Sequence, residues 1–153
     1  MKKFELTSET KINIFGKKLF RIKALISFGN VEAGETGGWV EKEENVNQSG
    51  DAWVFGNAEV FGNAEVFDNA WVSGNAWVSG NADYATIHGF GTQFRTTTFF
   101  RCKDKQVKVS CGCFYGTIPE FREQVKNTRK GKIAEEYLMI ADLMEKHFAE
   151  EAK

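Results

Sequence analysis

The sequence predicts an all-β core in which short parallel strands coil about three times, with an N-terminal β-hairpin and a C-terminal module of one hairpin and two helices. Three observations predict it: a six-residue repeat in the middle of the chain, alternating hydrophobic residues on both sides of it, and a helical hydrophobic pattern at the end. The 153 residues, 42% of them hydrophobic and 27% charged, suit one compact globular unit. We expect a hairpin cap over residues 1–38, the repeat over 39–90, and the C-terminal hairpin and helices over 91–153.

The repeat is clearest over residues 50–85, which read GDAWVF, GNAEVF, GNAEVF, DNAWVS, GNAWVS and GNADYA. Alternation places Ala and Val on one face of a short strand, and Gly-Asn tolerates the positive φ that a tight corner requires. With three such sides per coil, residues 18 apart stack at the strand spacing of roughly 4.8 Å. The register therefore places Ala52 on Ala70 and Val54 on Val72.

This spacing resembles the hexapeptide-repeat left-handed β-helix, in which a small residue follows an aliphatic one at the fourth position. The matching pairs are Val54 and Ala58, Val60 and Ala64, Val66 and Ala70, Val72 and Ala76, and Val78 and Ala82. The resemblance implies a short left-handed parallel β-helix. Only the resemblance supplies the handedness, because parallel crossovers are otherwise right-handed.

A second resemblance covers nearly the whole chain. The order of KKLFRIKAL and GGWVEKEEN, the GNA units, RTTTFFRCKD and VSCGCF resembles small hexapeptide-repeat proteins of phages and mobile elements that are loosely labelled polymer-forming. This resemblance implies a phage setting and no reaction.

The flanking segments look like caps for the open ends of the coil. Residues 11–25 predict a hairpin around Gly16, and residues 96–113 predict a second hairpin. A four-residue loop in the second hairpin would set Cys102 opposite Val107 and Cys111 opposite Thr98. The residues expected to share one face are then Phe100, Cys102, Val107, Val109, Cys111 and Cys113.

Two helices are expected after the second hairpin. Thr117 and Glu120 form a capping-box pattern that opens a helix ending near Asn127. Hydrophobic residues at helical spacing then predict an amphipathic helix over residues 132–149.

Large aromatic residues occupy outward positions of the repeat, where a bare monomer would expose them. These residues are Trp53, Phe55, Phe61, Trp71 and Trp77. Contiguous exposed hydrophobic surface usually marks an interface. We therefore expect these residues to bind a partner or a second copy of the chain, with the C-terminal helix as an alternative cover for one side.

The formal net charge of −1 hides unlike segments. Residues 31–90 contain one Lys and ten Asp or Glu, whereas residues 1–30 contain seven Lys or Arg and two Glu. Head-to-tail association is therefore electrostatically favourable, and an acidic mimic of nucleic acid that occupies a basic groove is an alternative. Direct binding to nucleic acid is not expected.

A possible ligand pocket involves His88, Arg95, Thr97 and Arg101. The two arginines flank Thr96 to Thr98, which could cradle an anion such as a nucleotide phosphate near the end of the repeat. The basic run from Arg122 to Lys132 could also touch phosphate, although its spacing is more typical of a solvated helix face.

Catalysis, metals and cofactors are not expected. An acyltransferase is the less favoured alternative, because a histidine base needs an orienting partner and no carboxylate lies near His88 in the sequence. Cys111 and Cys113 have C-x-C spacing, whereas zinc sites usually use C-x2-C. The cysteines are better explained as small core residues.

The favoured hypothesis is a non-catalytic, self-associating protein-binding module, phage-encoded and directed at a host component such as a defence system. The chain lacks an apolar run of about 20 residues and a signal-peptide core, so we expect a protein of the bacterial cytoplasm with no membrane partner. Three cysteines, an odd number, agree with reduced thiols.

Overall fold

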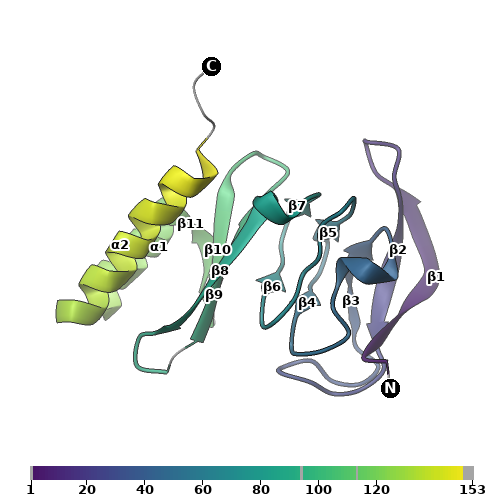
Figure 1. The fold of residues 1–153 in the computed structure, drawn as a ribbon, viewed down its shortest axis with the longest axis horizontal. Helices are drawn as coiled ribbons and strands as arrows, with labels where there is room; N and C mark the ends of the chain where they lie inside the picture. The colour runs from purple at the N-terminus through teal and green to yellow at the C-terminus, as the bar shows by residue number, and fades with distance from the viewer. Residues whose placement is uncertain (1, 94, 113, 150–153) are drawn as a thin grey trace.

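The computed structural model describes residues 2–93, 95–112 and 114–149, and it arranges them in successive layers (Figure 1). These residues form a five-stranded mixed sheet, a two-stranded parallel sheet, a four-stranded antiparallel sheet and two α-helices. In Figure 1 the N-terminal strands lie at one end, the repeat lies in the middle, and the helices lie at the other end.

The mixed sheet joins the N-terminal segment to the repeat, in the order β1-β2-β3-β5-β7. Its strands are β1 (Phe4–Ile12), β2 (Lys18–Ala24), β3 (Thr36–Val40), β5 (Glu59–Val60) and β7 (Trp77–Val78). The first three pair antiparallel, and β3, β5 and β7 pair parallel. The separate parallel pair consists of β4 (Trp53–Val54) and β6 (Trp71–Val72).

The expected left-handed parallel β-helix of about three coils is wrong. The repeat strands are two residues long, and they divide between the mixed sheet and the separate pair without closing a solenoid. Strands this short offer few ladder hydrogen bonds. The longer hairpin strands instead extend the sheet at β3 and turn it into a mixed one.

The 18-residue register inside the repeat is confirmed. Trp53 pairs with Trp71, Val54 with Val72, Glu59 with Trp77, and Val60 with Val78. The inward Ala and Val side chains of these strands are buried and form one continuous core.

Upstream of the repeat the spacing rises to 20 residues, since Val40 pairs with Val60 and Val46 bridges to Val66. Two extra residues between Val46 and Val54 cause the change. Gln48, within this longer segment, accepts hydrogen bonds through Oε1 from the backbone N–H groups of Lys3 (2.7 Å) and Phe4 (3.2 Å). The insertion therefore anchors the start of the chain.

The C-terminal module is a four-stranded antiparallel sheet with two helices packed on one face. Its elements are β8 (Tyr84–Phe90), β9 (Arg95–Arg101), β10 (Val107–Cys111), β11 (Phe114–Thr117), α1 (Ile118–Thr128) and α2 (Gly131–Phe148). Short 3-10 turns lie at Glu43–Asn45 and Asn81–Asp83. Both expected helices are confirmed, as is the capping box, in which Glu120 N–H donates to Thr117 Oγ1 (3.2 Å).

The expected register of the second hairpin is wrong by one residue. Val107 pairs with Arg101 rather than Cys102, because the loop closes with Lys105 at a positive φ of 66° and contains one residue more than expected. A slip of one residue moves side chains to the opposite face of a sheet. Phe100 and Cys102 consequently belong to the core of the repeat, whereas Val109 packs against the helices.

A buried carboxylate ties the three parts of the chain together. Glu59 lies between Trp39 and Trp77 in the mixed sheet and is 2% exposed. Its carboxylate contacts Lys11 Nζ of the hairpin at 2.9 Å and Lys103 Nζ of the β9–β10 loop at 3.2 Å. One side chain of the repeat therefore links both flanking segments.

We expect Glu59→Gln to lower the free energy of unfolding by about 1–3 kcal/mol, because it leaves two lysines without a counter-charge beside a buried site. Urea unfolding measures the change. Glu65→Gln is the matched control, since Glu65 occupies the same place in an identical hexapeptide but is exposed; it should change stability by less than about 0.5 kcal/mol. Equal losses in the two variants would contradict the role of Glu59.

No helix in the described part of the chain is long and apolar enough to span a membrane.

Candidate functional site

Trp53 is covered by the N-terminal segment of its own chain. Its ring is fully buried and meets Phe4 and Phe28 edge-on, with centroid distances of 5.8 and 5.2 Å. Gly37 lies so close that a Cβ there would come within 2.6 Å of the indole. The cover expected from the C-terminal helix or a second chain is therefore supplied by residues near the N-terminus.

The hairpin also covers the second aromatic side. Phe61 is buried against Leu19 and Trp39. Phe15, near the tip of the hairpin, lies 5.0 Å from the Trp77 ring and 5.8 Å from the Phe61 ring. Most of the surface predicted to bind a partner is thus occupied within the chain.

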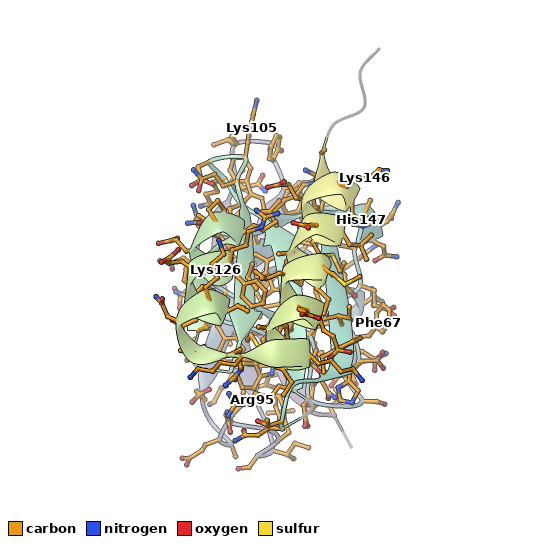
Figure 2. All side chains as sticks on the ribbon, turned by 90° about the vertical axis from the view of Figure 1, so that its left-hand side faces the viewer. Phe67, Arg95, Lys105, Lys126, Lys146 and His147 are labelled. Carbon is orange, nitrogen blue, oxygen red and sulfur yellow. The ribbon has the colours of Figure 1, made fainter. Side chains whose placement is uncertain are left out.

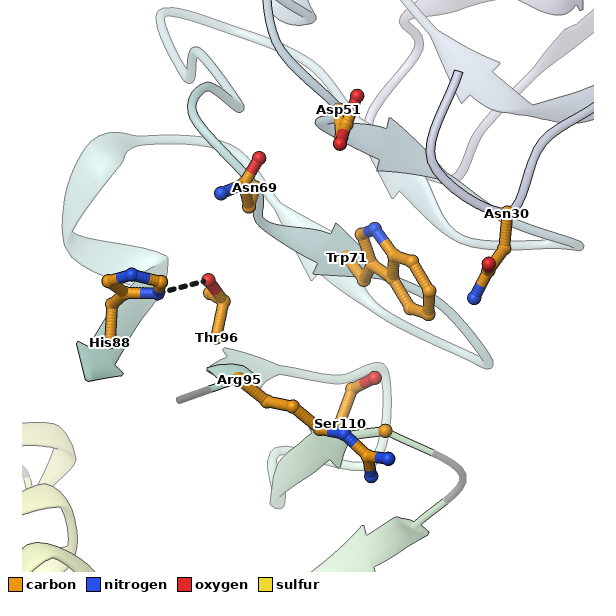
Figure 3. Close-up of a pocket in the computed structure, with 9 residues that line it drawn as sticks. Asn30, Asp51, Asn69, Trp71, His88, Arg95, Thr96 and Ser110 are labelled. Atoms are coloured by element: carbon orange, nitrogen blue, oxygen red, sulfur yellow. Dashed lines mark hydrogen bonds between the residues drawn. The ribbon is translucent and has the colours of Figure 1, made fainter. Parts of the chain in front are cut away.

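Trp71 and Phe55 stay half-buried, with ring centroids 5.4 Å apart. Trp71 projects into a cavity of about 520 Å³, called here the junction cavity, where the repeat meets the antiparallel sheet (Figure 3). Its lining residues are Asn30, Asp51, Asn69, Trp71, His88, Arg95, Thr96, Ser110 and Gly112. The volume lies within the range of small-molecule sites.

Backbone irregularities position the two basic residues of the junction cavity. The β8–β9 register shifts between Ile87 and Phe90, and His88 lies in this bulge. His88 Nδ1 lies 3.1 Å from Thr96 Oγ1, as Figure 3 shows. This hydrogen bond fixes the imidazole at the edge of the cavity.

Arg95 lies across the turn that follows β10. Gly112 has a φ of +58°, and a Cβ at this position would collide with the guanidinium of Arg95. Arg95 also donates a hydrogen bond to Gln93 Oε1. The glycine therefore lets the guanidinium rest on the backbone at the border of the cavity.

The structure brings His88 and Arg95 to one cavity, but not Thr97 and Arg101. Alternate residues of a strand face opposite sides, so Thr96 faces the repeat while the buried Thr97 donates to Cys111 Sγ at 3.1 Å. Arg101 instead pairs with Asp83 at 3.2 Å.

Several polar residues of the cavity were not predicted from the sequence as site residues. Asp51 and Asn69 occupy equivalent corners 18 residues apart, so the repeat itself could have predicted that they lie close together. Nothing in the sequence connects Asn30 or Ser110 with these corners, because they come from a distant loop and from β10.

The two cysteines that the structure describes, Cys102 and Cys111, lie in different cores. Cys102 faces the core of the repeat and Cys111 faces the helices, while Cys113 lies outside the described residues. Among the residues that the structure describes, no group of three or more His, Cys, Asp or Glu side chains could hold a metal ion.

No protein-family model matches the chain, and no curated protein sequence shows significant similarity to it.

A buried lysine contacts the backbone on both sides of Asp51, a residue of the junction cavity. Lys3 Nζ donates to the carbonyl oxygens of Ala52 (2.8 Å) and Gly50 (3.3 Å), and its ammonium lies 4.7 Å from the Phe28 ring centroid. Burial lowers the pKa of Lys3 to about 8, and the charge of Asp51 partly opposes this shift.

We expect the stability of the protein relative to Lys3→Met to rise with pH between about 8 and 10.5. In this window the folded chain has released the Lys3 proton while the unfolded chain still holds it, so deprotonation favours folding. Urea unfolding of both proteins across this range measures the difference. Taking the difference cancels the other titrating groups, and a flat or falling difference would contradict the prediction.

Proposed function

We propose that the chain is a binding protein for a small molecule with a flat ring and polar substituents, such as a nucleoside or nucleotide, and that the junction cavity is its site. The observation that carries this proposal is the half-buried Trp71 in a cavity of about 520 Å³. A ring stacked on an indole gains roughly 0.5–1.5 kcal/mol beyond the burial of its surface.

The polar lining suits the edge of such a ring. The amides of Asn30 and Asn69 donate and accept hydrogen bonds, the Asp51 carboxylate accepts, and the Ser110 hydroxyl does both. Arg95 adds one positive charge at the border of the cavity. This mixture of one aromatic face and several polar groups is typical of small-molecule sites.

We expect the protein to bind adenosine saturably and Trp71→Ala to weaken that binding about tenfold, because the stacking face is lost. Isothermal titration calorimetry measures the affinity. Trp77→Ala is the matched control, since Trp77 occupies the same slot of the next hexapeptide but contacts Phe15 instead of the cavity. Absence of binding, or equal weakening in two folded variants, would contradict the proposal.

A second candidate function is head-to-tail self-association, favoured by exposed hydrophobic residues on the β1–β2 hairpin and on α2. These elements lie at opposite ends of the molecule (Figure 1). One is the hairpin, where Ile12 and Ile14 are 65% and 78% exposed. Lys17 and Lys18 follow them in the hairpin and are also exposed. This end combines apolar surface with positive charge.

The other surface is the outer face of α2. Met139 and Leu143, one turn apart, are 69% and 57% exposed. Glu135 precedes Met139 by one turn, and Asp142, which also pairs with Arg122, follows it. Lys146 follows Leu143 by one turn, so this face carries charges of both signs, and its acidic border at Glu135 can meet the hairpin lysines of a second copy of the chain.

We expect Ile14→Glu and Met139→Lys each to abolish assembly beyond the monomer in sedimentation velocity, since each removes one half of a head-to-tail contact. An equal mixture should form a dimer and nothing larger, because one intact hairpin and one intact helix remain between the two variants. Phe67→Glu, an exposed change away from both ends, is the control. A monomeric wild-type protein would contradict self-association.

A further inference from the structure

A second, smaller cavity of about 160 Å³ lies between the antiparallel sheet and the helices. Arg95 at the start of β9 and Arg129 after α1 both line it, together with Gln93, Gln124 and Tyr137. None of its described lining residues is Asp or Glu. The cavity is well below the roughly 300 Å³ of a drug-sized site, so it suits a single small group.

Arg95 and Arg129 bring two positive charges to this cavity. Among the described residues neither forms an ion pair with a carboxylate, whereas Arg122 of α1 pairs with Asp142 (2.8 Å) and Glu145 (3.0 Å). Among the residues that the structure describes, the only side-chain hydrogen bond of Arg95 is to the neutral side chain of Gln93. Within the described ranges, two positive charges therefore line one cavity without a carboxylate counter-ion.

The charges of Arg95 and Arg129 both act on the Tyr137 hydroxyl. Burial and the neighbouring Cys111 raise the pKa of the Tyr137 hydroxyl, while the charges of Arg129 and Arg95 act in the opposite direction. Both guanidinium groups thus lie within electrostatic reach of one buried hydroxyl. The Tyr137 hydroxyl and the two guanidinium groups can all donate hydrogen bonds to an anion.

We propose that this cavity binds a phosphate group, held between Arg95 and Arg129. Guanidinium groups present paired N–H donors that match the oxygens of a phosphate. The amides of Gln93 and Gln124 and the Tyr137 hydroxyl supply further donors at the same place. Arg129 alone would be a solvated residue at the end of α1. Arg95 comes from a strand more than thirty residues earlier, and the two arginines together form the site.

Arg95 also lines the junction cavity, so the two cavities are neighbours. A ligand whose ring stacks on Trp71 would have to pass the start of β9 to place a phosphate between the arginines, and a mononucleotide is the ligand class that combines such a ring with a phosphate. This last step rests on the proposed function, whereas the phosphate site itself does not.

In the first experiment, isothermal titration calorimetry measures the binding of inorganic phosphate to the protein at low ionic strength. We expect saturable binding that weakens at least tenfold in Arg129→Gln and in Arg95→Gln, and a smaller loss in Arg129→Lys, which keeps the charge but not the paired donors. Lys126→Gln is the matched control, because Lys126 lies higher along α1, away from Arg95 (Figure 2). Arg129 is exposed, so its replacement leaves the core intact.

Non-saturable binding, or equal weakening in Lys126→Gln, would overturn the phosphate site.

The second experiment compares adenosine with adenosine monophosphate. We expect the monophosphate to bind at least tenfold more tightly than adenosine, and this advantage to vanish in Arg129→Gln. Trp71→Ala should weaken adenosine while leaving inorganic phosphate unchanged. Loss of adenosine binding alone would overturn the proposed function, loss of phosphate binding alone would overturn this inference, and equal affinities would overturn the shared ligand.

Discussion

The narrow interior of the repeat, to which its own strands contribute Ala and Val side chains, is the constraint on which the rest of the structure depends. Strands of two residues stacked at 18-residue intervals bury their small inward side chains completely. They leave Trp, Phe and Glu side chains on the outside, and large aromatic surface left in water is costly. The N-terminal hairpin and the C-terminal sheet therefore pack on the repeat, and the site lies where these parts meet.

Glu59 shows how the covering segments are held in register. A carboxylate buried between two tryptophans would be strongly unfavourable without counter-charges. Lys11 and Lys103, from the segments before and after the repeat, supply them. The junction cavity is likewise built from different parts of the chain. Trp71 comes from the repeat, whereas Arg95 and His88 come from the sheet that covers it.

Much of the local structure could be predicted from the sequence, because it depends on residues that are close along the chain. The 18-residue register, the N-terminal hairpin, the capping box at Thr117 and both helices follow from short-range patterns. The overall class was wrong since the pairing of β2 with β3 is a tertiary choice that no repeat encodes. The predicted register of the second hairpin was wrong because the loop contains one residue more than expected, and residue propensities do not determine loop length to one residue.

For the candidate site, His88, Arg95 and Thr96 could be grouped from the sequence, but nothing in it connected them with Trp71 or with Asp51 and Asn69. The limit of the sequence is clearest in two identical hexapeptides, GNAEVF at residues 56–61 and again at 62–67. The sequence by itself determined that Val60 and Val66 point inward in both. Only the tertiary structure decided that Phe61 is buried while Phe67 is 42% exposed. Leu19 and Trp39 cover Phe61, and because that cover comes from distant residues, identical local sequences acquire different surroundings.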